Sequence, residues 1–244
     1  MTRRRWIADE SSGNRAALTG DHAVHLSRVL RARLGQEFDI ATPSGVRRGH
    51  ITKVSEQRVE FELGEAVDAA QAAEVVILLA IFKFDRYEWA VEKLTELGIA
   101  HLVPLIAHRT DPHLAAAAGK RAERWRRVSL AAAEQSRRDG PPEISAPASL
   151  HQALAHNAAL RVVLAEPELD ASARQLSELL ADHQADQKNG SSLGLAIGPE
   201  GGWTSQEMAA FRQHGWQNAS LGPLVLRAET AAIAAAAIAA ALWQ

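Results

Sequence analysis

The spacing of apolar and polar positions changes near residue 70. Before that point, short stretches alternate between apolar and polar residues or carry β-branched side chains, as strands do. The strands predicted in this part are 6–8, 37–41, 49–54 and 59–63. Turn-forming residues such as Gly45 separate them, and Asp21 is a suitable N-cap for a helix that ends near Arg33. We expect a small β-barrel domain over residues 1–70.

From Glu74 onward, apolar runs alternate with amphipathic segments, which is typical of a parallel sheet with helices on both faces. The expected strands are 75–82, 101–106, 161–165, 193–197 and 218–221. The expected helices are 86–97, 114–135, 149–155, 171–181 and 205–214. Polar residues 181–192 predict a loop, and charges with proline and glycine at 137–143 predict another. The fold class is therefore α/β, with a second domain over 74–244.

Composition narrows the class of protein. The chain is 47% hydrophobic and 23% charged, as in globular proteins with a sizeable core. Zero cysteines exclude disulfides, thiolate metal sites and cysteine nucleophiles. The basic start precedes no apolar run, and the alanine-rich stretch 228–243 is shorter than the roughly 20 residues of a membrane span and contains Glu229. We expect a cytoplasmic protein without a membrane segment.

The net charge of -2 is unevenly distributed. Residues 1–60 hold 11 basic against 7 acidic side chains, a net charge of +4, which leaves -6 for the remainder. Basic segments suit polyanions, because cations that neutralise phosphates release condensed counterions. A solvated basic face gives the same composition, so charge alone leaves both interpretations open.

The first motif is Leu-Ala-Ile-Gly-Pro-Glu-Gly-Gly-Trp at 195–203. A buried strand ends at Ile197, a tight turn follows, and Thr204 or Ser205 can cap a helix with Glu207 in its first turn. Open α/β sheets bind ligands at this end of their strands, where glycine lets the main chain approach closely. An ordinary strand-to-helix loop has the same pattern. The spacing is neither a dinucleotide fingerprint nor a P-loop, which disfavours NAD enzymes, kinases and Rossmann-type methyltransferases.

The second motif, Leu-Gly-Pro-Leu-Val-Leu-Arg-Ala-Glu-Thr-Ala at 221–231, is another strand end that leads directly into a helix. That helix is nearly all alanine, which favours helix formation. It has no polar face, so we expect it to be buried where other backbone packs very close.

Both motifs resemble the C-terminal signatures of the RsmE family, which are SPOUT enzymes that methylate N3 of a uridine in 16S ribosomal RNA near the decoding site. Segments 25–35, 88–109 and 134–144 resemble further family motifs, so the resemblance covers nearly the whole chain. Two positions depart from the family. Leu224 stands where an arginine is common, and Lys83-Phe-Asp-Arg86 replaces a Lys-Gly-Asp-Lys-like run.

The resemblance implies a SPOUT-type parallel sheet with a C-terminal trefoil knot, in which the chain after Leu221 threads through an earlier loop. It also implies that the first domain is a PUA-like RNA-binding β-barrel. Threading and close packing require small side chains, which residues 234–237 supply. Such enzymes act as homodimers, and the implied partner is 16S rRNA within the small ribosomal subunit.

The implied cofactor is S-adenosyl-L-methionine, held mainly by backbone in the segments 164–166, 197–202 and 221–226. The candidate cofactor-binding residues are Leu164, Ala165, Glu166, Ile197, Gly198, Gly201, Gly202, Leu221, Gly222, Leu226 and Thr230. Arg227 is the candidate catalytic cation, because a fixed cation stabilises negative charge that spreads onto uracil oxygens. Glu229 is either a base or, as we favour, a carboxylate that positions Arg227 through an ion pair. For Glu200 we favour a role as a helix-dipole partner.

Arginines supply the candidate RNA contacts, although each alone is more often a solvated charge. These candidates are Arg5, Arg28, Arg31 and Arg33 in the first domain, and Arg86, Arg109, Arg137 and Arg138 in the second. We expect no metal, because His22 and His25 share a helix face but two ligands do not make a site. A noncatalytic RNA-binding protein, and a SPOUT enzyme acting on tRNA or on a ribose hydroxyl, remain alternatives.

Overall fold

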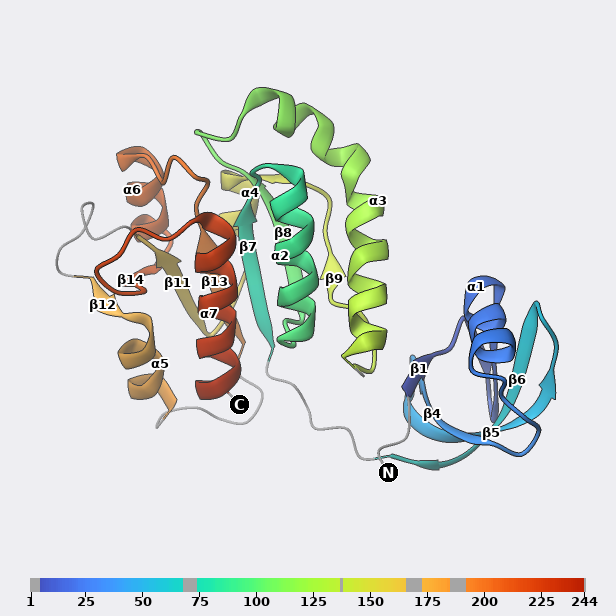
Figure 1. Ribbon diagram of the computed structural model, residues 1–244. Coiled ribbons are helices and arrows are strands. Elements are labelled where there is room, and N and C mark those ends of the chain that lie inside the picture. Colours follow the sequence, from blue (N-terminus) through green and yellow to red (C-terminus); the bar gives the residue numbers. More distant parts are fainter. Residues whose placement is uncertain (1–4, 68–73, 137, 166–172, 185–191, 244) are drawn as a thin grey trace. The chain divides into compact units, whose positions relative to one another are not determined.

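The computed structural model describes residues 5–67, 74–136, 138–165, 173–184 and 192–243, and its contacts form two units (Figure 1). The first unit comprises residues 1–71 together with 133–140. The second comprises residues 72–132 and 141–244. The break in the hydrophobic pattern near residue 70 thus coincides with a change of unit, but the later segment 133–140 groups with the first unit as well.

The described part of the first unit forms a curled sheet of six strands in the order β1-β4-β5-β6-β3-β2 (Figure 1). The strands are β1 (Arg5–Ile7), β2 (Glu10–Ser12), β3 (Arg15–Thr19), β4 (Glu37–Thr42), β5 (Gly45–Val54) and β6 (Arg58–Ala66). Neighbouring strands are antiparallel except β1 and β4. At Gly49 a Cβ would lie 2.7 Å from Ile40 Cγ1, so only glycine allows β4 and β5 to approach this closely.

The helix of this unit is shorter than predicted. α1 (Gly20–Val24) begins after Thr19 and continues into one π-helical turn, η1 (His25–Val29). The predicted N-cap Asp21 lies inside the first turn, and the predicted end at Arg33 is wrong. The reason is Arg31, whose φ of 51° is left-handed and terminates the helix. β2 and β3 were missed, because alanine and serine carry little strand signal.

His22 lies between two carboxylates of the first unit. Its Nδ1 is 3.0 Å from Asp9 Oδ1, and its Nε2 is 3.0 Å from Glu134 Oε1. Glu134 is the main cause that raises the pKa of His22 to about 9, with Asp9 adding to it and partial burial opposing it. Only the protonated ring can donate from both nitrogens.

This arrangement predicts a pH-dependent stability. Because the pKa of His22 in the folded protein lies above the unfolded value of 6.5, the contribution of His22 to the free energy of unfolding is fully present below about pH 6.5. It is lost as pH rises through about 9. The loss should reach at most about 3 kcal/mol. Urea unfolding of the wild type and His22→Gln at pH 6 and pH 9.5 measures it, since the difference between the two proteins should shrink at the higher pH. An identical difference at both pH values would contradict the assignment.

The described part of the second unit is a parallel sheet of eight strands in the order β10-β8-β7-β13-β11-β14-β12, with β9 beside β8. The strands are β7 (Val75–Ala80), β8 (His101–Ile106), β9 (Glu143–Ile144), β10 (Ala148–Ser149), β11 (Leu160–Leu164), β12 (Arg174–Gln175), β13 (Leu193–Ile197) and β14 (Gln217–Ser220). The helices are α2 (Phe84–Glu96), α3 (Pro112–Gln135), α4 (Leu150–Leu154), α5 (Leu176–Gln184), α6 (Ser205–Gln213) and α7 (Ala228–Leu242). The predicted α/β class is confirmed.

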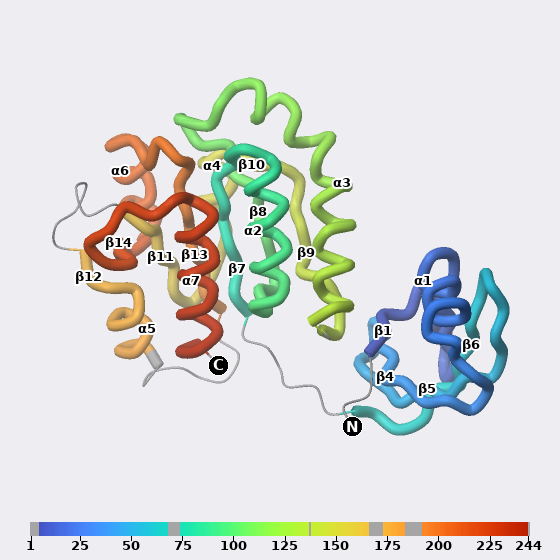
Figure 2. Tube along the Cα trace, viewed as in Figure 1, coloured from blue at the N-terminus to red at the C-terminus, as the bar shows by residue number. Residues whose placement is uncertain are grey.

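Helices cover both faces of this sheet (Figures 1 and 2). Along β7, Val75, Ile77 and Leu79 join a core shared with α2, α3, α5 and α7. The alternate residues Val76 and Leu78 join a second core under α4 and α6. A strand buried on both faces reads as a continuous apolar run, which is why these strands were predictable.

Three details of the second unit were not predicted. β9, β10 and β12 have two residues each, too few for a period to be visible in the sequence. The helix predicted at 171–181 starts at Leu176, and residues 171–172 lie outside the described part. It also runs on to Gln184, so the loop predicted from 181 begins later than expected.

The alanine helix α7 is buried on one side only, so the predicted burial is confirmed in part: Ala237 and Ala241 are exposed. Ala232, Ala235 and Ala239 are fully covered, and α7 packs against both α2 and α5. Small side chains permit this close packing. Among the described residues, no helix is both long and apolar enough to cross a membrane.

Candidate active site

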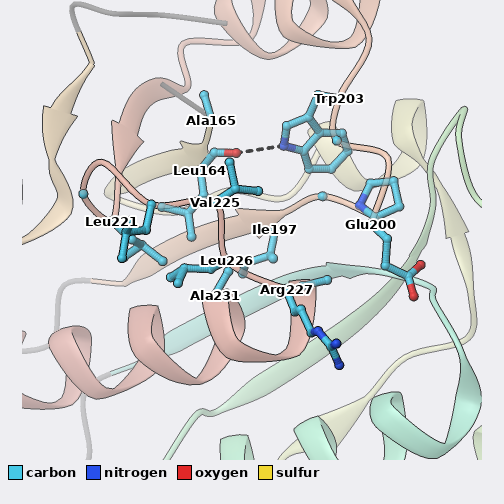
Figure 3. Close-up of a pocket in the computed structure, with 16 residues that line it drawn as sticks. Leu164, Ala165, Ile197, Glu200, Trp203, Leu221, Val225, Leu226, Arg227 and Ala231 are labelled. Carbon is cyan, nitrogen blue, oxygen red and sulfur yellow. Dashed lines mark hydrogen bonds between the residues drawn. The ribbon is translucent and has the colours of Figure 1, made fainter. Parts of the chain in front are cut away.

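A cavity of about 250 Å³ opens at the carboxyl ends of β11, β13 and β14 (Figure 3). Aliphatic side chains, glycines and main chain make up most of its wall. The lining residues are Leu164, Ala165, Ile197, Gly198, Pro199, Glu200, Gly202, Trp203, Leu221, Gly222, Leu224, Val225, Leu226, Arg227, Ala228 and Ala231. Both sequence motifs therefore meet at one cavity, as expected for strand ends in a parallel sheet.

Most of the predicted cofactor-binding residues line this cavity. Gly201 and Thr230 do not, and Glu166 lies outside the described residues. Four lining residues fall outside the predicted cofactor segments: Trp203, Arg227, Ala228 and Ala231, of which Arg227 alone was predicted, as the catalytic cation. Ala231 could have been found from its position one helical turn after Ala228, because residues three apart share a helix face.

Trp203 shapes the glycine loop 198–202. Its indole Nε1 donates to the Leu164 carbonyl at 3.0 Å, as the dashed line in Figure 3 shows, so it joins the loop after β13 to the end of β11. A Cβ at Gly198 would lie 3.2 Å from the Trp203 ring. Gly202, with φ of 69°, donates its N–H to the Pro199 carbonyl at 2.8 Å. Gly198 is thus needed because the Trp203 ring approaches its backbone closely, and Gly202 is needed because the chain turns there with a left-handed φ.

Glu207 holds the far end of the same loop. As predicted, it forms a capping box with Thr204, accepting the Thr204 N–H at 2.8 Å. Its other oxygen accepts the His108 N–H at 2.8 Å, from the loop after β8. In that loop Arg109 donates to the Gly201 carbonyl. Arg109, predicted to contact RNA, therefore has a local role in supporting the glycine loop.

Removing the Glu207 carboxylate should loosen this loop. Glu207 is 5% exposed and accepts two part-buried N–H groups, so Glu207→Ala removes both hydrogen bonds and should cost about 1 to 3 kcal/mol of unfolding free energy. Glu178→Ala, an exposed first-turn carboxylate on α5, is the matched control and should cost less than about 1 kcal/mol. If urea unfolding showed the same loss of unfolding free energy for both variants, the contacts of Glu207 with Thr204 and His108 would add no stability beyond that of an exposed carboxylate.

Arg227 and Glu229 point to different surroundings. Arg227 is the N-cap of α7, and its side chain lines the cavity without an ion pair or hydrogen bond to any described residue. In Figure 3, it and Glu200 extend away from the aliphatic lining. Glu229 is 5% exposed and does not line the cavity; its Oε1 lies 3.7 Å from Arg86 Nε.

The ion pair between Glu229 and Arg227 that we favoured from the sequence is therefore absent among the described residues. Residues two apart on a helix do not face each other, which explains the difference. The second oxygen of Glu229, Oε2, is buried and has no hydrogen-bond partner in the described part of the chain. Glu229 thus joins the start of α7 to α2 through Arg86.

The remaining predicted RNA contacts that the structure describes all belong to the first unit, including Arg138, which the sequence had placed in the second domain. Arg5 pairs with Asp139 at 2.5 Å and Arg28 with Glu56 at 2.5 Å. Burial lowers the pKa of Arg138, and Arg137 lies outside the described residues. The side chains of Arg31 and Arg33 are exposed. No three His, Asp or Glu side chains gather as a metal site would need in the described parts of the chain.

A family model described as RNA methyltransferase domain matches residues 69–240. The chain is 29% identical over 219 residues to ribosomal RNA small subunit methyltransferase E of Bacillus subtilis, covering 88% of this chain and 85% of that protein. It is 32% identical over 235 residues to the protein of that name from Mycobacterium tuberculosis, covering 92% and 85%.

Among solved structures, a methyltransferase from Legionella pneumophila in complex with its bound cofactor SAM superimposes with a TM-score of 0.77 at 26% identity. The match covers 99% of this chain and 98% of that one. The motifs, the fold and the relatives agree. The chain therefore belongs to the ribosomal RNA small subunit methyltransferase E family, the RsmE family that its C-terminal motifs predicted.

Proposed function

We propose that this protein methylates N3 of a uridine in 16S rRNA of the small ribosomal subunit, using S-adenosyl-L-methionine (SAM). The observation that carries the proposal is the cavity at three strand ends, aliphatic inside, with Arg227 at its edge, a cation that forms no ion pair with any residue the structure describes. Membership of the RsmE family supplies the substrate class. The relatives are named for the small-subunit ribosomal RNA on which they act.

The cavity suits SAM for a reason visible in its wall. Leu164, Ile197 and Leu226 offer an apolar surface for an adenine ring, while Gly198 and Gly222 leave main chain open for hydrogen bonding. The Legionella protein holds SAM on the same fold. When bound, SAM would supply a methyl group made electrophilic by its sulfonium sulfur.

Arg227 would then favour the reactive form of the base. The N3–H of uracil is a weak acid, and only the deprotonated nitrogen is a good nucleophile. A guanidinium beside the uracil oxygens stabilises the anion, and its charge is undiminished here because no carboxylate of the described residues pairs with it. Glu229 stands away from the cavity, so we assign it to holding α7 through Arg86 and let the N3 proton leave to solvent.

We also propose that the C-terminal segment is knotted and that the first unit is a PUA-like barrel. Strand order supports the knot: β11 and β12 follow each other in the sequence, yet β14 lies between them. The small residues of α7 suit a threaded segment. For the first unit, the support is its curled sheet of mostly antiparallel strands.

A homodimer is the assembly that we propose. Its support is the presence of exposed apolar side chains on two helices that pack against each other. Trp89 on α2 is 48% exposed, and α2 packs against α7, on which Ala237 and Ala241 are exposed. A large exposed aromatic beside small apolar residues is typical of a subunit interface.

Reverse transcription across 16S rRNA tests the proposed function. N3 methylation blocks the Watson–Crick edge, so the polymerase should arrest at one uridine in wild-type cells and read through in cells that lack this protein. A plasmid copy of the wild-type gene should restore the arrest. An arrest that persists unchanged in the deletion strain would overturn the uridine-N3 assignment.

A further inference from the structure

The solvent face of α3 is basic in its middle part. Lys120, Arg124 and Arg127 are exposed, and their spacing of four and three residues places them on one side of the helix. Ala122 and Trp125 face the core on the opposite side. The acidic residue of this stretch, Glu123, pairs with Arg126 at 3.6 Å, and in the described part of the chain neither Lys120 nor Arg127 has an ion pair.

A fourth cation, Arg121, extends this surface toward α2. Glu88 of α2 lies 2.7 Å from Arg124 Nε and 3.5 Å from Arg121 Nη1. The Arg121 guanidinium also stacks 4.9 Å from the centre of the Phe84 ring. One carboxylate therefore holds two arginines, which stay 44% and 56% exposed at their side chains. Less conformational entropy is lost when such fixed cations bind an anion.

In sequence, the helix that carries the basic face begins close to a residue that supports the cavity. α3 starts at Pro112, three residues after Arg109, which holds the glycine loop of the cavity through the Gly201 carbonyl. At 1.5 Å per residue, Lys120 and Arg127 lie about 12 and about 22 Å along the helix from that start. A chain of nucleotides leaving the cavity can therefore reach these cations.

We propose that Lys120, Arg121, Arg124 and Arg127, here named the α3 basic face, bind the RNA backbone that flanks the methylated nucleotide. This inference rests on the proposed function. Arginines presented as fixed planar forks suit phosphate oxygens. The exposed neighbours on that side are Ala116 and Ala131, which offer no bulky apolar group for insertion into a membrane.

Charge neutralisation tests the α3 basic face. The triple variant Lys120→Gln, Arg124→Gln and Arg127→Gln should weaken binding of small ribosomal subunits by about 10- to 100-fold at moderate salt. The slope of log affinity against log salt should fall by about 2 to 3. The KM for the subunit should rise while kcat at saturation and SAM affinity stay at wild-type values.

A second triple variant removes the same charge elsewhere in the unit. Arg161→Gln, Arg174→Gln and Arg212→Gln replace partly or fully exposed arginines on β11, β12 and α6 and should leave the salt slope unchanged. Equal slopes for both triple variants and the wild type would overturn the proposal. The proposal would also be overturned if the triple variant of the α3 basic face lost binding to phosphatidylserine vesicles while its affinity for RNA stayed at the wild-type value. If the wild type itself neither binds nor methylates subunits, the proposed function fails instead.

Discussion

Replacing Arg227 by alanine is expected to lower turnover by about 100- to 1000-fold while SAM affinity changes little. Arg227 lies at the edge of the cavity, and its guanidinium extends away from the aliphatic lining and pairs with no described residue, so the fold does not depend on it. The cation is needed when negative charge develops on the uracil, which is a property of the transition state and not of the bound cofactor. Single-turnover methylation of small subunits gives the rate, and calorimetric titration gives the SAM dissociation constant.

Two further variants test whether the shape and the position of the Arg227 cation matter. Arg227→Lys keeps a charge but loses the planar fork, so its rate should fall between those of the wild type and Arg227→Ala. Arg174→Ala, on the edge strand β12, should leave both rate and affinity unchanged. Equal losses of rate and SAM affinity in Arg227→Ala would mean that Arg227 is mainly a cofactor ligand.

Replacing Ala231 by leucine is expected to weaken SAM binding by about 10- to 100-fold without unfolding the protein. Ala231 lines the cavity from the first turn of α7, so a larger side chain there would occupy volume that the cofactor needs. Leucine is itself a good helix former, and α7 should remain intact. Calorimetric titration with SAM measures the effect, and thermal unfolding checks the fold.

Ala181→Leu is the matched control, since Ala181 is an exposed residue of α5 that neither lines the cavity nor belongs to the proposed interface. It should bind SAM as the wild type does. If both variants bound SAM equally well, the cofactor would have to lie outside this cavity.

The strand ends and the cavity were predictable because their signals are local. A buried strand is a continuous apolar run, and a glycine and proline turn after it, as at Gly198 and Pro199, marks where it ends. The presence of α7 was predictable from its alanine content, whereas the exposed side that carries Ala237 and Ala241 was not, because a helix without a polar face is expected to be buried all round.

Contacts between distant segments were not predictable. Glu207 has a local partner in Thr204 that the sequence reveals, but its second partner, the His108 N–H, comes from another strand end. The pairing of Glu229 with Arg86 likewise depends on how α7 packs against α2. One carboxylate can have many partners at such distances in sequence, and only the folded arrangement selects one.

The most direct test of the central claim is the chemical identity of the product. Small ribosomal subunits from cells that lack this protein are incubated with the purified enzyme and SAM carrying a labelled methyl group, and the rRNA is digested to nucleosides for mass spectrometry. We expect the label in 3-methyluridine, at one residue per subunit at most, and none with Arg227→Ala in the same time. Label on a ribose, on another base, or on no nucleoside at all would contradict uridine-N3 methylation.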